Sequence, residues 1–192
     1  NTGSIEGNFA NAGTATTKAE VIGGTIDNIG TLYLSGTLAK AVTGDDGVTK
    51  IDTSLTFADA NANISGGLDM NDGELILSSG SITSHNLGSL TGYGSLVLDM
   101  MFTNTEEGNS IETDKLFADN FGTGTDIITV TALNTLGNKN AFEDAIIEYA
   151  INDAPINETG EVTTVHYEST VLNGVNPLHL QLSDDVKAQY NQ

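Results

Sequence analysis

Short segments that alternate apolar and polar residues recur along this chain at nearly regular intervals. They read TLYLSG (31–36), SLTFAD (54–59), ELILSS (74–79), SLVLDM (95–100) and KLFADN (115–120). Their first leucines are Leu32, Leu55, Leu75, Leu96 and Leu116, at steps of 23, 20, 21 and 20. Alternation over so few residues is typical of a β-strand with one buried face.

A strand pattern that recurs at an almost fixed period predicts a solenoid, in which each repeat is one coil stacked on the last. The apolar segments are separated by Gly, Asn, Asp, Ser and Thr, which favour turns. We therefore predict an all-β fold, a single-stranded right-handed parallel β-helix (β-solenoid) over 1–151, with coils of about 20 residues. Residues 152–192 are expected to form an irregular C-terminal cap, or an exit or assembly segment. The alternative is a β-sandwich, whose strands usually recur about every 8–12 residues.

The charge of the chain excludes several classes of partner. Six lysines and no arginine stand against 26 acidic residues, which gives a net charge of −20. Such a chain has too few cations to meet nucleic-acid phosphates, and it would be repelled by anionic membranes. A membrane-spanning helix needs an apolar run of about 18 residues or more, so we expect no membrane insertion of this segment. Because the sequence starts at Asn1 without a signal-like stretch, we expect a mature chain or a fragment.

Part of the sequence resembles the passenger region of pertactin-like autotransporters. The resemblance lies in GYGSLVLDMMF (92–102), TDKLFADNFGTGTDIITVTAL (113–133) and EDAIIEYAI (143–151). The matched positions are Asp114, Lys115, Leu116, Gly122, Gly124 and residues 127–130, whereas the charged segment 136–144 and residues 152–192 depart from the family pattern. The resemblance implies a right-handed β-helix on the outside of a bacterium, often acting as an adhesin.

The sequence contains no recognisable catalytic constellation. His85, His166 and His179 are far apart in sequence and have no metal-binding spacing, and no G-x-S-x-G elbow occurs. Acidic pairs are plentiful, and some β-helix enzymes cleave polysaccharides with acidic residues in a groove, so a glycan-cleaving lyase or hydrolase is the alternative function. The chain lacks Trp and Arg, which such sites usually use, and we predict a non-enzymatic protein with no required cofactor.

Two acidic turns are candidate calcium sites. The segment TGDDGV (43–48) contributes Asp45 and Asp46, and LDMNDGEL (68–75) contributes Asp69, Asn71 and Asp72. Carboxylate and amide oxygens are ligands that Ca²⁺ prefers. The competing interpretation is that both are ordinary acidic turns with glycine.

One outward-facing column is a candidate interface. If the leucines of each repeat face inward, then Tyr33, Ile76, Val97 and Phe117 face outward on successive coils. Stacked, they would form an exposed apolar stripe, which either a loop of this chain or a partner would cover.

These features together predict an extracellular protein of the bacterial cell surface. We expect a rod that acts as an adhesin or structural spacer, with self-assembly into a filament, sheath or surface layer through its sheet edges. Its expected partners are identical subunits, or a glycan or protein of a host or cell surface.

Overall fold

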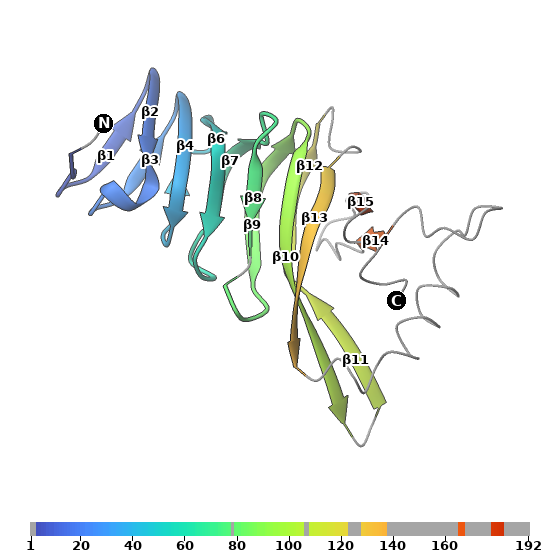
Figure 1. Ribbon diagram of the computed structural model, residues 1–192. Coiled ribbons are helices and arrows are strands. Elements are labelled where there is room, and N and C mark those ends of the chain that lie inside the picture. The colour runs from blue at the N-terminus through green and yellow to red at the C-terminus, as the bar shows by residue number, and fades with distance from the viewer. Residues whose placement is uncertain are drawn as a thin grey trace.

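The computed structural model of the protein is an all-β parallel solenoid, which confirms the predicted fold class (Figure 1). It describes residues 3–77, 79–105, 108–122, 128–137, 165–167 and 178–182. The strands are β1 Phe9–Asn11, β2 Thr14–Lys18, β3 Ile26–Asn28, β4 Thr31–Leu38, β5 Val42–Thr43, β6 Val48–Phe57, β7 Ile64–Asp69, β8 Glu74–Ile76, β9 Ser84–Thr91, β10 Gly94–Thr105, β11 Gly108–Thr113, β12 Lys115–Phe121, β13 Ile128–Gly137, β14 Val165–Tyr167 and β15 Leu178–Leu182. A 3₁₀ turn, η1, spans Ala19–Val21.

The coils contain about 19 residues each and complete about five turns. In Figure 1 they follow one another along the rod from the N-terminus, with the strands of each coil lying against those of the next. At about 4.8 Å per coil, the stack is roughly 25 Å long.

Parallel pairing arranges the strands in three stacks, joined where strands bend around the corners of the coil. The first stack is β1, β3, β5, β7, β9 and β12. The second contains β2, the first halves of β4 and β6, and the ends of β7, β9 and β12. The third contains the ends of β4 and β6, followed by β8, β10, β13 and β15.

Aliphatic side chains fill the interior of the coils, one above another. Leu55, Leu75 and Leu96 lie in register on adjacent coils of the third stack and are fully or almost fully buried. The predicted inward column is therefore confirmed at these three positions.

Leu32 and Leu116, at the two ends of the predicted column, are buried as well, but they lie in other stacks. Leu32 pairs with Ala15 and Thr49 in the second stack, and Leu116 pairs with His85 in the first. The cause is a variable coil length, because a single period cannot align coils that differ in their number of residues. The first coils, from Thr14 to Thr31 and from Thr31 to Val48, are shorter than the later ones.

A hairpin accounts for the longest coil. Strands β10 and β11 pair antiparallel from Met100↔Thr113 to Thr105↔Gly108 and project from the side of the rod (Figure 1). Strand β13 follows β10 in parallel as far as Phe102↔Gly137. The hairpin explains why Ser89 and Asn120, which are neighbours in the second stack, lie so far apart in sequence.

The first coils meet closely at the corner between the first and second stacks. Asn11 and Asn28 stack inside this corner, where the Asn11 side-chain amide donates to Asn28 Oδ1 at 2.8 Å. The backbone N–H of Thr31 donates to the Gly13 carbonyl at 2.7 Å, which brings the two coils together at Gly30. A Cβ on Gly30 would lie 2.2 Å from that same carbonyl oxygen, so only glycine fits.

Part of the predicted C-terminal segment 152–192 is described. Strand β15 adds to β13 in parallel, and β14 pairs with β15 antiparallel. The remaining residues of the predicted cap lie outside the described residues.

Candidate functional site

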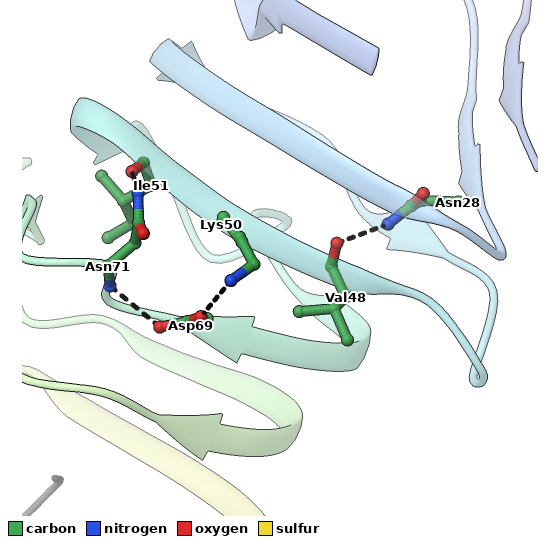
Figure 2. A network of polar contacts seen from close by, with 6 residues as sticks. All are labelled: Asn28, Val48, Lys50, Ile51, Asp69 and Asn71. Atoms are coloured by element: carbon green, nitrogen blue, oxygen red, sulfur yellow. Dashed lines mark hydrogen bonds and ion pairs between the residues drawn. The ribbon is translucent and has the colours of Figure 1, made fainter. Parts of the chain in front are cut away.

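The turn at residues 69–72 is a predicted calcium site. Its Asp69 and Asn71 side chains hydrogen-bond backbone groups of the turn and of the neighbouring coil (Figure 2). Asp69 Oδ1 accepts the backbone N–H of Asn71 at 2.9 Å, and the Asn71 side-chain amide donates to the Ile51 carbonyl at 3.0 Å. Asn71 and Asp72 both have positive φ angles, a conformation that Asn and Asp tolerate better than most residues. The interpretation as an ordinary acidic turn therefore accounts for these side chains.

Lys50 forms an ion pair with the other carboxylate oxygen of Asp69. Its ammonium nitrogen lies 2.8 Å from Asp69 Oδ2, on the neighbouring coil of the second stack (Figure 2). The hydrogen bond to Asp69, together with the attraction between the two charges, raises the pKa of Lys50.

Replacing Lys50 with glutamine tests how much this ion pair stabilises the fold. Both side chains are partly exposed, so we expect the free energy of unfolding to fall by less than about 1 kcal/mol. This loss of unfolding free energy should be smaller still at about 1 M salt, which screens exposed charges. Urea denaturation at low and high salt measures both values, and a larger, salt-independent loss would contradict this.

Asp45 and Asp46 lie in a different turn, at the corner between β5 and β6, and both are exposed. The turn at residues 69–72 lies between the second and third stacks, so the two candidate calcium turns occupy different corners. Within the described residues, no three side chains from His, Cys, Asp and Glu are grouped as metal ligands.

A shallow groove of about 460 Å³ runs along the corner that contains Asp45. Its lining combines glycine backbone with short polar and acidic side chains, from Asp45, Ser65, Gly66, Gly67, Gly88, Ser89, Asp119 and Asn120. The glycines keep the coils close, because a Cβ on Gly66 would lie 2.3 Å from the Gly47 carbonyl oxygen. These groups can hydrogen-bond a polar ligand, but the described part of the lining offers no aromatic surface on which a sugar ring could stack.

The predicted apolar stripe is divided between the stacks. Ile76 and Val97 lie in register on adjacent coils of the third stack, and both are partly exposed. Tyr33 lies instead in the second stack beside Lys50, and Phe117 in the first stack beside Asn86. The four residues therefore do not form one column, and only the pair Ile76 and Val97 can contribute to a shared surface.

A buried polar cluster joins β9 to the base of the hairpin. The backbone N–H of Thr83 donates to Asp114 Oδ1 at 2.7 Å, and that of Asp99 donates to Asp114 Oδ2 at 2.7 Å. Thr83 Oγ lies 3.0 Å from Asp114 Oδ1 and 2.9 Å from His85 Nε2. Asp99 in turn accepts the Gly80 backbone N–H at 2.7 Å.

Burial shifts the pKa values of two members of this cluster, since His85 and Asp114 are both 0% exposed. Desolvation lowers the pKa of His85 and raises the pKa of Asp114. Because the groups lie inside the coil, they hold the hairpin base rather than meet a substrate.

The sequence pattern did not reveal this cluster, since residues 83, 85, 99 and 114 come from three separated segments. The one available signal was alternation, which places His85 on the same face as Leu87, a buried residue.

No family model, curated protein or solved structure matches the chain. Among the described segments, no helix is long and apolar enough to cross a membrane.

Proposed function

We propose that this chain is a non-enzymatic, extracellular rod of a bacterial cell surface, which self-assembles head to tail into a filament, sheath or surface layer. The support for the surface location is the acidic solenoid and its resemblance to autotransporter passengers. The support for assembly comes from the N-terminal coil, which has the features of an internal coil.

The glycines of the first coil carry this proposal. Gly24 and Gly30, in the second coil, are tightly enclosed by the first coil: their Cβ atoms would lie 2.4 Å from Asn8 Oδ1 and 2.2 Å from the Gly13 carbonyl oxygen. Gly7 and Gly13 hold the equivalent positions one coil earlier, yet a Cβ on either would meet no atom within 4 Å. Among the described residues, packing therefore does not require glycine at these two positions, and glycine becomes necessary when another coil stacks on the first one.

The interior of the first coil supports the same conclusion. Ile5, Phe9 and Ala15 face the core but are only partly buried, whereas their neighbours Ile22, Ile26 and Leu32 on the second coil are buried. An additional coil would cover them, and burial of apolar surface would stabilise the contact.

The partner that we propose is a second copy of this chain. Strands β1 and β2 each pair on one side only among the described residues, with β3 and β4. At the other end of the same stacks, β12 pairs only with β9 within the described part. Since all these strands run parallel, β12 of one copy could continue the ladder onto the first coil of the next, and repetition of this contact gives a filament.

Gly13→Val tests the assembly, because its side chain would enter the space of an added coil while leaving the isolated rod intact. Ala12→Val is the matched control, since Ala12 is exposed and adjacent to Gly13. We expect filaments or sheets of the wild type and of the control by negative-stain electron microscopy, and short rods of Gly13→Val with unchanged melting temperature.

Light scattering at increasing protein concentration should show the same difference between the variants. Assembly of Gly13→Val equal to that of the wild type would refute the head-to-tail contact. Short rods for all three proteins would leave a monomeric adhesin as the function, which glycan-array binding would then examine.

A further inference from the structure

The last coil of the first stack carries a lysine on its outer face. Lys115 lies between Asp114 and Leu116, which are both buried, so its side chain points away from the core. Within the described part of the chain, its ammonium group belongs to no ion pair, whereas that of Lys50 pairs with Asp69 at 2.8 Å. In a chain whose net charge is −20, a cation at this end of the rod fits an acidic group of a partner.

The register of the first stack determines which residue of a second copy would follow Lys115. One column of paired residues runs through the whole stack and consists of Phe9, Ile26, Val42, Ile64, Leu87 and Ala118. If the first coil of the next copy continues this column, its Phe9 follows Ala118. The pairing keeps one register over residues 5–9 of the first coil and 115–118 of the last, so Glu6 then follows Lys115.

Glu6 occupies the same kind of position in the first coil as Lys115 does in the last. It is exposed and follows Ile5, which packs against the core. Gly23, the neighbour of Glu6 on the second coil, donates its backbone N–H to the Ile5 carbonyl at 2.7 Å. Lys115 donates in the same way to the Thr83 carbonyl on the coil before it, at 2.9 Å. Both side chains therefore lie on the outer face, at equivalent places in the ladder.

We infer that Lys115 of one copy forms an ion pair with Glu6 of the next, and that this pair fixes the register of the head-to-tail contact. The inference rests on the proposed assembly and adds the residues that align it. The rod contains the same arrangement between its own coils, because Lys50 and Asp69 are paired in register in the second stack and their side chains meet. A shift of the contact by two residues would separate Lys115 from Glu6, so the pair selects one register.

The other facing positions fit this register. It places Phe9, which is partly buried, against the small core residue Ala118. It also places Asp119 against Ala10, so that the outer faces of the two strands bring no like charges together. Apolar contact inside the coil and opposite charges outside it therefore favour the same alignment.

Reversing each charge tests the pair against general repulsion between acidic chains. Glu6→Lys makes the net charge less negative by two, and Lys115→Glu makes it more negative by two. General repulsion would therefore promote assembly of Glu6→Lys, whereas the ion pair predicts that both changes hinder assembly, since like charges then face each other. We expect the critical concentration for assembly, measured by light scattering at low salt, to rise about tenfold for each variant. The double variant should return to the wild-type value.

The outcomes separate the ion pair from the assembly itself. Wild-type filaments together with undiminished assembly of Glu6→Lys would overturn the pair and leave the head-to-tail contact standing. A double variant that assembles no better than Lys115→Glu would overturn the pair as well. Wild-type chains that stay single rods at every concentration would overturn both the contact and the pair.

Cysteine cross-linking tests the register without relying on charge. The chain contains no cysteine, and residues paired on neighbouring strands have Cα atoms about 5 Å apart, within the range for a disulfide. We expect the double variant Glu6→Cys, Lys115→Cys, oxidised after assembly, to give a ladder of covalent oligomers on a gel without reductant. The matched control is Asn8→Cys with Lys115→Cys, which is offset by two residues and should give little cross-linking. Equal ladders from the two proteins, or no ladder from the first in the presence of filaments, would overturn the inferred register.

Discussion

Replacing Gly30 with alanine is expected to lower the free energy of unfolding by about 3 kcal/mol, near the upper end of the range for overpacking. The added Cβ would lie 2.2 Å from the Gly13 carbonyl oxygen and 2.8 Å from the Ala12 carbonyl carbon. These are backbone atoms, so no side chain can move aside. Separation of the coils would also break the bond from the Thr31 N–H to the Gly13 carbonyl.

Gly13→Ala is the control, because it is the same change at the equivalent corner of the first coil. A Cβ there meets no atom within 4 Å, and loss of glycine flexibility in the unfolded chain is slightly favourable. We therefore expect a change within about 0.5 kcal/mol, the range usual for surface substitutions. Chemical denaturation followed by circular dichroism, at concentrations below assembly, measures both variants. Equal losses at Gly30 and Gly13 would show that the close approach of the coils is not what requires glycine.

The sequence predicted the solenoid because alternation and recurrence are local properties of the chain. Leu55, Leu75 and Leu96 were placed correctly, since the two coils that they span differ little in length. Leu32 and Leu116 were misplaced because the early coils are shorter, and because the hairpin is inserted before Leu116. An insertion changes the register of every later residue, and the sequence pattern of the hairpin strands is no different from that of coil strands.

The variable coil length also limits what the sequence can predict about the candidate interface and the buried polar cluster. Tyr33 and Phe117 were assigned to the column of Ile76 and Val97, an inference that depended on a constant period. The polar cluster could not be predicted for a related reason. Asp114 accepts hydrogen bonds from residues on β10 and before β9 only when the hairpin closes. Predicting such contacts requires the length of every coil, which turn residues alone do not specify.

Leu75→Ala is expected to destabilise the rod by about 2–5 kcal/mol, the usual cost of removing a buried leucine side chain. Leu75 is 0% exposed and lies between Leu55 and Leu96, so the cavity would open between three consecutive coils. Neighbouring coils cannot easily collapse into this space, because backbone hydrogen bonds on both sides fix their separation. The loss should therefore lie in the upper half of the range.

Ile76→Ala provides the matched control for Leu75→Ala, since it removes a side chain of equal size from the next residue on the outer face. Ile76 is partly exposed, so we expect a loss of about 1 kcal/mol or less. Thermal and urea denaturation of the two variants, side by side, measure the difference. A loss at Ile76 as large as that at Leu75 would mean that a further part of the protein, or a second copy, covers the outer face of the third stack. In that case the pair Ile76 and Val97 would be part of an interface, a shorter version of the stripe that the sequence pattern predicts.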